Sequence, residues 1–288
     1  MLLNYIVWNV SPDIFSVPDS VPVIGGFTLR WYGVLFATGF VLGYLILQKI
    51  FKKEGIDQKL TDDLFTYMFI FTILGARLGH VLFYEPHYYF THPLQILEIW
   101  HGGLASHGAA IGILLGLYLF ARKHKKTYIW VLDRIAIVVP LAGFFIRMGN
   151  LMNSEIFGYP THMPWGFIFV RSDIPALAVG PHHPTQIYEG LSYLLIFVFL
   201  YRYYQTHKTS LKPGKLFGYF MLLIFLARFL IEFLKEPQEA WEKHLWFDMG
   251  QILSIPLIIL GIGVLIWAAR QKGENFLKKD SDTKSPAK

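Results

Sequence analysis

Residues Ile252–Ala269 read ILSIPLIILGIGVLIWAA, a stretch of 18 residues without a charged side chain. A helix needs about 17–25 mostly apolar residues to cross a hydrocarbon core of roughly 30 Å. The run is too continuous for the strand of a membrane barrel, which alternates over about ten residues. We therefore interpret it as a membrane-spanning helix.

The composition of the whole chain extends this interpretation. Of 288 residues, 54% are hydrophobic and 16% are charged, against roughly 45–50% and about 25% in soluble domains. The excess of apolar surface predicts an all-α integral membrane protein. Seven stretches are long and apolar enough to span: Phe27–Ile50, Leu64–Tyr84, Leu104–Ala121, Tyr128–Ile146, Ile187–Tyr204, Leu216–Leu234 and Ile252–Ala269.

Basic residues indicate the orientation of these spans. Lys and Arg cluster between Lys49 and Lys59, between Arg122 and Lys126, between Arg202 and Lys215, and in the tail from Arg270. The intervening connections are nearly free of them. By the positive-inside rule, the N-terminus is outside and the C-terminus cytoplasmic. The basic residues behind the net charge of +6 therefore set the orientation of the spans in the membrane, and we expect no nucleic-acid partner.

The remaining segments suggest three parts. Residues 1–26 form an external N-terminal arm, 27–270 the seven-span domain, and 271–288 a disordered cytoplasmic tail. The long connection at about 148–186 is interpreted as a small external head with a strand-like piece at Trp165–Val170. Because the chain has no cysteine, disulfides, thiolate metal sites and a cysteine nucleophile of its own are excluded.

Ionisable groups inside spans are costly, so each needs a partner or a function. Most of those in this chain converge on the outer leaflet, and one, Arg134, lies toward the cytoplasm, where we expect it to snorkel beside Asp133. At 1.5 Å per residue, Arg228 lies about 9 Å and Arg77 about 10 Å inside the outer end of its span. The outer group also includes Arg30, His107, Arg147, Glu189 and Glu232.

Several of these residues also have a purely structural interpretation. Arg228 and Glu232 are four apart and could neutralise each other on one helical face. Arg77 lies in GARLGH, whose small residues could pack helices closely, and its role stays open between structure and function. His107 alone would be a hydrogen-bonded structural histidine. Without an HExxH motif or cysteine, the histidine pair at 182–183 is a weak metal candidate, and we expect no metal.

The segment RMGNLMNSEIFG, Arg147–Gly158, is harder to explain structurally. Asn and Gly disfavour helix interiors, so we expect the helix to end within this segment and turn. The result is a guanidinium, amides and a carboxylate at headgroup depth. Arginine offers a planar fork that matches phosphate, and Arg228 could supply a second one. The sequence therefore favours a phospholipid-headgroup site.

Together, these residues and their surrounding segments resemble the bacterial prolipoprotein diacylglyceryl transferase family along nearly the whole length of the chain. The matching stretches occur in order, and the fourth resembles the family signature: RWYG from Arg30, GARLGHVLFY from Gly75, HGGLASHG from His101, RMGNLMNSEIFG from Arg147, HPTQIYEG from His183, RFLIEFLKEP from Arg228 and MGQILSIP from Met249.

The resemblance implies where the important positions lie. Where the chain matches the family motifs, the expected catalytic residues are His107, Arg147, Arg228 and Glu232. The residues expected to bind substrate are Tyr32, Arg77, Asn150, Glu155, Gly158 and Glu189. Four positions depart from the common family pattern, namely Ser106, Ile146, His182 and Lys235. None of them removes an expected catalytic residue, but His182 and Lys235 weaken the idea of extra arginines at the substrate.

The resemblance also implies the reaction. The enzyme would transfer the diacylglyceryl group of phosphatidylglycerol to the lipobox cysteine of a prolipoprotein signal peptide, forming a thioether and releasing sn-glycerol 1-phosphate, without a cofactor. Thiolate is the nucleophile, so a base is needed, and histidine titrates nearest neutral pH. His107 is the first candidate. Glu155 or the substrate phosphate would leave His107 as an orienting group. Arg147 and Arg228 would stabilise the departing phosphate, with Glu232 orienting Arg228.

The resemblance further implies a multi-pass protein of the bacterial inner membrane with its site in the outer leaflet. The alternative is a transporter or lipid-binding protein that holds an anionic headgroup. Transporter sites usually lie near the midplane between repeats, and neither feature is evident in this sequence. An intramembrane protease is a third option, but GxSxG and HExxH are both missing.

Overall fold

The computed structural model describes residues 5–21, 25–98, 102–103, 105–172, 180–236 and 247–273. Most of the expected tail, 271–288, and parts of the N-terminal arm and the head lie outside these ranges. The chain divides into two compact units. Unit 1 comprises 1–46 and 135–275, and unit 2 comprises 47–134 and 276–288.

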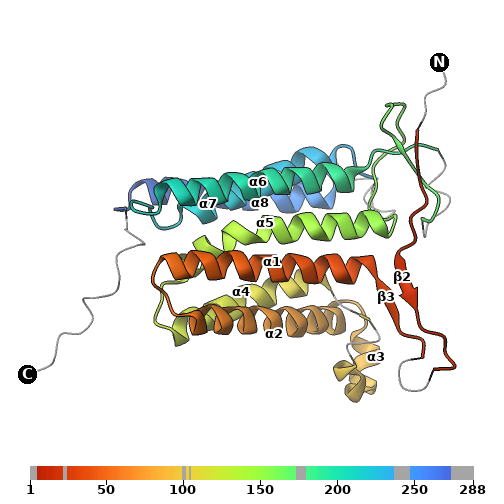
Figure 1. Cartoon of the computed structure of the whole chain (residues 1–288), viewed down its shortest axis with the longest axis horizontal. Helices are drawn as coiled ribbons and strands as arrows, with labels where there is room; N and C mark the ends of the chain where they lie inside the picture. The colour runs from red at the N-terminus through yellow and green to blue at the C-terminus, as the bar shows by residue number, and fades with distance from the viewer. Residues whose placement is uncertain are drawn as a thin grey trace, which may run out of the picture. The chain divides into compact units, whose positions relative to one another are not determined.

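Every apolar stretch predicted from the sequence contains a long helix (Figure 1). The long helices in the described part of the chain are α1 Trp31–Lys53, α2 Gln58–Phe83, α4 Ser106–Lys123, α5 Tyr128–Met152, α6 Thr185–His207, α7 Lys215–Glu232 and α8 Met249–Ala269. Four of these, α1, α2, α5 and α8, are long and apolar enough to cross a membrane by length and composition. The mostly helical membrane fold is thus confirmed.

Short elements occupy the connections. Strands β1 Ile6–Trp8 and β4 Phe167–Phe169 pair in parallel, with Ile6 opposite Phe167. Strands β2 Asp13–Ser16 and β3 Thr28–Arg30 pair antiparallel. The predicted strand in the head is therefore confirmed as β4, whereas the predicted start of the first helix at Phe27 is wrong, because Thr28–Arg30 pair with β2 before α1 begins.

In unit 1, α7 packs along α8 and α6 packs along α7 (Figure 1). Glycine permits the close approach of α7 and α8, since a Cβ at Gly261 would lie 2.7 Å from the backbone nitrogen of Leu222. A small apolar core of Leu151, Phe157, Phe167 and Phe169 lies beneath Trp8. The Trp8 indole N–H donates to the Leu151 carbonyl at 2.9 Å, which joins the N-terminal arm to the end of α5.

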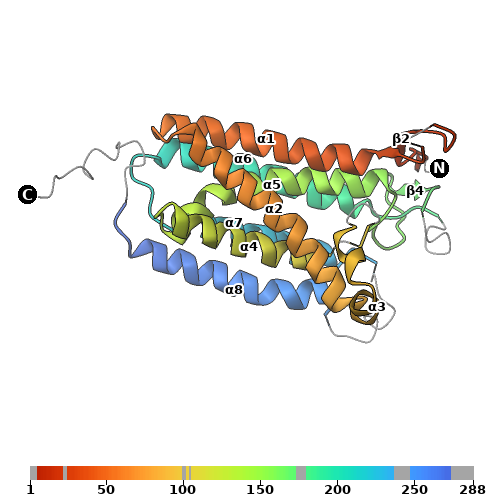
Figure 2. The ribbon, with the colours of Figure 1, turned by 90° about the horizontal axis from the view of Figure 1, so that it is seen from below.

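In unit 2, α2 and α4 pack against each other through paired glycines (Figure 2). A Cβ at Gly79 would lie 2.7 Å from the Cα of Gly108, and a Cβ at Gly75 would lie 2.8 Å from the Cα of Gly112. Backbones can approach this closely only where neither helix carries a side chain. The close packing expected of the GARLGH segment is therefore confirmed.

Arg134 in unit 2 corrects one expectation. Its side chain is 1% exposed and does not snorkel. Nη2 lies 2.7 Å and Nε 3.1 Å from Oε2 of Glu54, and the guanidinium stacks over Trp130 at 3.5 Å. A buried charge requires a partner, and Glu54, 80 residues away in the sequence, supplies it.

Candidate functional site

The signature segment forms a strained turn at the end of α5. The helix continues through Gly149 and Asn150 and ends at Met152, inside the segment in which the sequence predicts its end. Ser154 and Ile156 then adopt positive φ angles of 55° and 60°. A positive φ is unfavourable for a β-branched residue, and such strain persists where the surrounding contacts enforce it.

Hydrogen bonds within this segment order its polar side chains. Arg147 Nη1 donates to Asn150 Oδ1 at 3.1 Å, and Asn150 Nδ2 donates to Glu155 Oε1 at 2.7 Å. Asn153 Nδ2 donates to the same oxygen at 3.2 Å. Asn150 is 5% exposed. The segment thus folds back so that its guanidinium, amides and carboxylate share one network.

The start of α6 holds the turn in place. Thr185 Oγ1 donates to the Ile156 carbonyl at 2.8 Å, and Gln186 Nε2 donates to the Glu155 carbonyl at 2.6 Å. The backbone N–H of Gly158 donates to the His183 carbonyl at 2.8 Å. These bonds satisfy backbone groups that the unusual turn leaves outside a helix, and they explain why this connection carries short polar residues.

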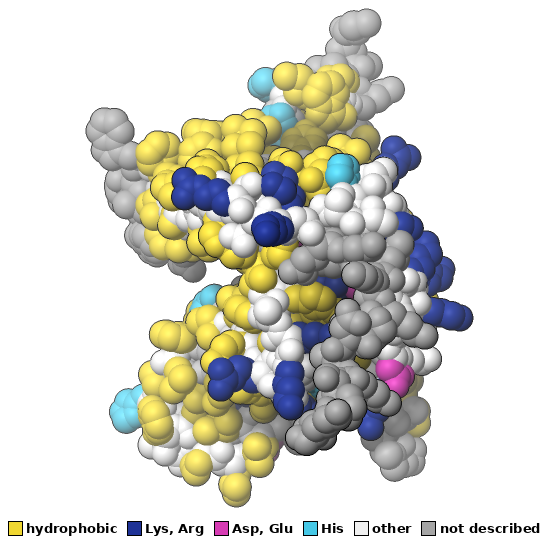
Figure 3. Space-filling view, turned by 90° about the vertical axis from the view of Figure 1, so that its left-hand side faces the viewer, with side chains coloured by type: hydrophobic (Ala, Val, Ile, Leu, Met, Phe, Trp, Pro, Cys, Tyr) yellow, Lys and Arg dark blue, Asp and Glu magenta, His cyan; other side chains and the backbone are white. Residues whose placement is uncertain are grey.

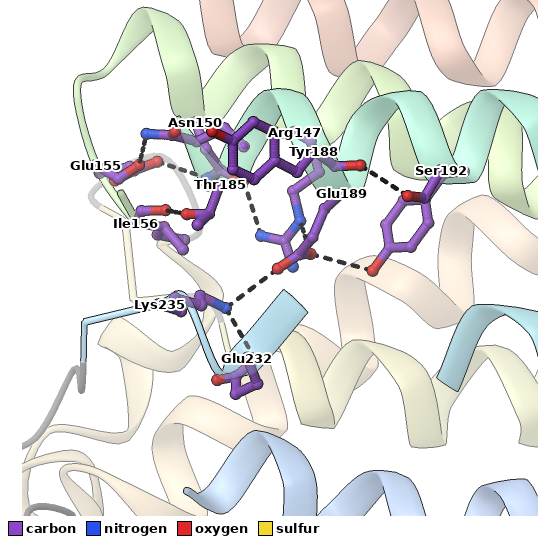
Figure 4. Close-up of polar contacts among 12 residues, drawn as sticks. Arg147, Asn150, Glu155, Ile156, Thr185, Tyr188, Glu189, Ser192, Glu232 and Lys235 are labelled. Carbon is purple, nitrogen blue, oxygen red and sulfur yellow. Dashed lines mark hydrogen bonds and ion pairs between the residues drawn. The ribbon is translucent and has the colours of Figure 1, made fainter. Parts of the chain in front are cut away.

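Glu189 on α6 is the centre of the charged site (Figure 4). Its Oε2 lies 2.5 Å from Nε of Arg147 and accepts the hydroxyl of Tyr193 at 3.1 Å. Its Oε1 lies 3.4 Å from Nζ of Lys235. Glu189 is 1% exposed, and a buried carboxylate remains charged only when cations and donors surround it. Here one carboxylate orients the signature arginine.

Glu232 pairs differently from the expectation. The predicted ion pair with Arg228 is wrong, because Glu232 Oε2 lies 3.4 Å from Nζ of Lys235. Its carboxylate also lies against Gly250 in the first turn of α8, where a Cβ would be 2.7 Å from Oε2. Arg228 forms no hydrogen bond or ion pair with another described residue, although its charge acts on Glu189. Its guanidinium donors are therefore available to a ligand.

Tyr32 and Gly158 also lie with this network. The Tyr32 ring covers the backbone of Gly149, where a Cβ would lie 2.7 Å from Cδ2, and its hydroxyl is influenced by Glu155 and Arg147. Gly158 faces the chain after α7, since a Cβ there would collide with the Leu234 carbonyl oxygen. The structure therefore brings together eight of the ten residues expected from the sequence: Tyr32, Arg147, Asn150, Glu155, Gly158, Glu189, Arg228 and Glu232.

His107 and Arg77 belong to unit 2. The exposed His107 ring stacks on Tyr84 at 5.6 Å between centroids and meets Phe83 edge-on at 5.9 Å. It makes no hydrogen bond within the described part of the chain. Because the ring nitrogens are not engaged by the protein there, they can exchange a proton with a substrate.

Arg77 has a structural role in this geometry. It is 4% exposed, and its guanidinium donates to five backbone carbonyls, those of Gln95, Ile96, Glu98, Gly102 and Gly103, at 2.5–3.3 Å. A guanidinium has five N–H donors. The network of carbonyls therefore favours the structural interpretation of Arg77 over substrate binding, because the side chain holds the connection between α2 and α4.

His182 and His183 both contact other protein groups. His182 is 1% exposed, and its Nδ1 lies 2.8 Å from the Gly158 carbonyl. Burial, and secondarily His182, lower the pKa of His183, whose Nδ1 lies 3.1 Å from the Tyr188 hydroxyl. Burial, with Asp248 and Glu236, raises the pKa of Tyr159. Among the described residues, no group of three potential ligands could hold a metal ion.

Two members of the site were not among the residues expected from the sequence. Tyr193 lies four residues after Glu189, one helical turn along α6, and this spacing was a usable signal. Lys235 was noted only as a departure from a common arginine. Its position gives no local sign of pairing with Glu189, which is 46 residues away.

The chain is similar to known proteins along most of its length. The family described as prolipoprotein diacylglyceryl transferase matches residues 20–267. A protein of Tolumonas auensis, named phosphatidylglycerol–prolipoprotein diacylglyceryl transferase, is 46% identical over 92% of this chain and 98% of its own length. Proteins with the same name from Chloroherpeton thalassium and Porphyromonas gingivalis are each 43% identical, over 93% and 92% of this chain and 96% and 95% of their own lengths.

Proposed function

Because the chain belongs to the prolipoprotein diacylglyceryl transferase family, we propose that it transfers the diacylglyceryl group of phosphatidylglycerol to the lipobox cysteine of a prolipoprotein. The products are a thioether-linked lipoprotein precursor and sn-glycerol 1-phosphate. This is the first step of bacterial lipoprotein maturation. The observation that carries the proposal is the buried network in which Glu189 orients Arg147 (Figure 4).

The chemistry is a displacement at carbon. The cysteine thiolate attacks the diacylglycerol carbon that bears the phosphate ester, and a carbon–sulfur bond forms as the carbon–oxygen bond breaks. The electron pair of that bond goes to the phosphate oxygen. The enzyme needs no nucleophile of its own, which fits a chain without cysteine. Its tasks are to remove the thiol proton and to stabilise negative charge on the departing phosphate.

We assign the phosphate to Arg147 and Arg228. Glu189 and Asn150 each engage one side of the Arg147 guanidinium, which leaves further N–H donors for a ligand. Arg228 keeps its donors free of described protein groups and is the second candidate. Two planar guanidinium groups can donate paired hydrogen bonds to the oxygens of one phosphodiester. Tyr32, Asn150, Glu155, Gly158 and Glu189 complete the substrate-binding part, and Glu232 supports it through Lys235.

We assign the base to His107. Its ring packs against Phe83 and Tyr84 and forms no hydrogen bond with the described residues, so a nitrogen lone pair is available. The alternative base, Glu155, already accepts two amide hydrogen bonds on Oε1. These bonds commit that oxygen to the network of the turn after α5. His107 is therefore the better candidate.

We further propose seven spans, with the N-terminus outside and the C-terminus in the cytoplasm of a bacterial inner membrane. The support is a long helix in every apolar stretch and the alternation of basic connections. In the view of Figure 3, the described side chains include many more Lys and Arg than Asp and Glu. In this arrangement residues 1–26 are an external arm, 27–270 the catalytic domain, and 271–288 a cytoplasmic tail. The site then faces the outer leaflet.

A transporter or lipid-binding protein is not favoured, since the relatives are named as transferases. Purified protein incubated with phosphatidylglycerol and a lipobox peptide distinguishes the two. We expect the peptide to gain the mass of one diacylglyceryl group on its cysteine, with equimolar glycerol phosphate released. A peptide with serine in place of that cysteine is the control. Phosphatidylglycerol binding without any mass gain would favour the lipid-binding alternative.

A further inference from the structure

A buried lysine lies at the junction of the charged network. Lys235 is 3% exposed, and its Nζ is 3.4 Å from Oε1 of Glu189 and 3.4 Å from Oε2 of Glu232. Removing an ammonium from water costs several kcal/mol unless charged partners compensate. Both partners are carboxylates from different helices, so Lys235 is the link between α6 and the end of α7.

The link continues in both directions. The second oxygen of Glu189 holds Nε of Arg147 on α5 at 2.5 Å, and Glu232 lies one helical turn after Arg228 on α7. The series Arg147, Glu189, Lys235, Glu232 thus alternates in charge from α5 through α6 to α7 (Figure 4). The proposed phosphate-binding arginines stand on the first and last of these helices.

The backbone places Lys235 for this contact. Gly158 of the signature segment forms an antiparallel bridge with Lys235, and the Tyr159 N–H donates to the Leu234 carbonyl at 2.9 Å. Any side chain at position 158 would collide with that carbonyl. The signature glycine therefore has a defined structural task, which is to admit the segment that carries Lys235.

We propose that Lys235 is a positioning residue for the transfer reaction. By tying Glu189 to Glu232, its ammonium fixes the separation of the Arg147 and Arg228 guanidiniums around one phosphate. The inference rests on the proposed function. It assigns no substrate contact to Lys235, because the side chain is buried and both of its carboxylate partners belong to the protein.

The test compares steady-state transfer by the wild type, Lys235→Met and Lys235→Arg, with phosphatidylglycerol and a lipobox peptide. Methionine keeps the length of the side chain and removes its charge, whereas arginine restores the charge. We expect Lys235→Met to lower kcat by about 10- to 100-fold, as small misplacements of catalytic groups do, with a smaller change in KM for phosphatidylglycerol. Lys235→Arg should recover most of kcat.

Glu54→Gln is the matched control, because it breaks a buried carboxylate–cation pair outside the site, Glu54 with Arg134, in unit 2. Thermal unfolding in detergent gives the folded fraction of each variant. We expect Glu54→Gln to lower the melting temperature while kcat per folded molecule stays at the wild-type value. A purely structural Lys235 would behave in the same way, and that result would overturn the inference.

Two further results would also overturn it. A rise in KM with unchanged kcat for Lys235→Met would make Lys235 a substrate-binding cation. If Lys235→Met does not fold, the charge-balanced variant Glu232→Gln/Lys235→Met replaces it, and wild-type kcat in that double variant would contradict the inference. Absence of transfer by the wild-type protein would instead contradict the proposed function, so the two failures are distinguishable.

Discussion

The carboxylate of Glu232 lies directly against the backbone of Gly250, where a Cβ would be 2.7 Å from Oε2. Gly250 is in the first turn of α8, whose N-cap Asp248 and Gln251 form a capping box. A helix N-terminus carries a partial positive charge that favours a nearby carboxylate. Glu232 is therefore held by two features, the Lys235 ammonium and the start of α8, and only glycine at 250 permits the second.

Gly250→Ala tests this relationship. The added methyl group must displace the Glu232 carboxylate, so we expect lower transfer activity and a loss of about 1–3 kcal/mol in the free energy of unfolding, as overpacking produces. Gly263→Ala on the same helix is the control, because a Cβ there meets nothing within 4 Å. Alanine should leave that variant as stable as the wild type or slightly more stable. Equal behaviour of the two variants would argue against the proposed contact.

Local composition predicts the helices well, since a spanning helix depends on its own apolar length. Helix ends are less predictable, because they depend on partners elsewhere. Thr28–Arg30 belong to a strand only because Asp13–Ser16 lie beside them. Asn150 stays helical because its side chain is engaged by Arg147 and Glu155 instead of competing for the backbone.

The members of the site were more predictable than their pairing. Charged residues in apolar stretches are conspicuous in a sequence, and this property pointed to Arg147, Glu189 and Glu232. Which charged residues form ion pairs depends on the tertiary structure. Glu232 pairs with Lys235 and not with Arg228. Arg134 pairs with Glu54 and does not snorkel beside Asp133. Spacing rules allow both i, i+3 and i, i+4 pairs and so do not choose between Lys235 and Arg228 as the partner of Glu232, and Glu54 lies 80 residues from Arg134, beyond the reach of such rules.

Arg147→Lys is expected to abolish most of the activity. Lysine retains the charge but cannot engage Glu189, Asn150 and a phosphate in one plane. We expect kcat to fall by a factor equivalent to about 2.7–4 kcal/mol, as for lost transition-state donors. Arg30→Lys is the control, because Arg30 forms a single exposed ion pair with Asp13. Comparable loss of activity in both variants would contradict a specific role for the Arg147 fork.

Arg77→Lys should mainly lower stability. Lysine has three donors, whereas Arg77 supplies hydrogen bonds to five carbonyls. A fully buried carbonyl left without a partner costs about 1–3 kcal/mol, and these partly buried carbonyls should each cost less. We expect a lower melting temperature in detergent and a near-wild-type KM for phosphatidylglycerol at temperatures where the variant is folded. A large rise in that KM with unchanged melting temperature would return Arg77 to the substrate-binding residues.

Reporter fusions test the proposed topology. Fusions within Lys49–Lys59, Arg122–Lys126 and Arg202–Lys215 should report cytoplasm, because short basic connections stay inside. A fusion in the connection between α5 and α6 should report the outside. A single basic connection found outside would invalidate the seven-span count and the placement of the polar residues in one leaflet.

His107→Gln tests the proposed base. Glutamine keeps a polar group of similar reach but cannot accept the thiol proton, and loss of general base catalysis typically costs about 10²- to 10⁴-fold in rate. We expect turnover to fall in this range while phosphatidylglycerol binding to the purified protein is retained. His124→Gln is the control in the same unit, because His124 pairs with Asp63 and is not assigned to the reaction. Near-normal turnover of His107→Gln would transfer the base role to Glu155 or to the substrate phosphate. A loss of lipid binding would instead make His107 a group that orients the substrate.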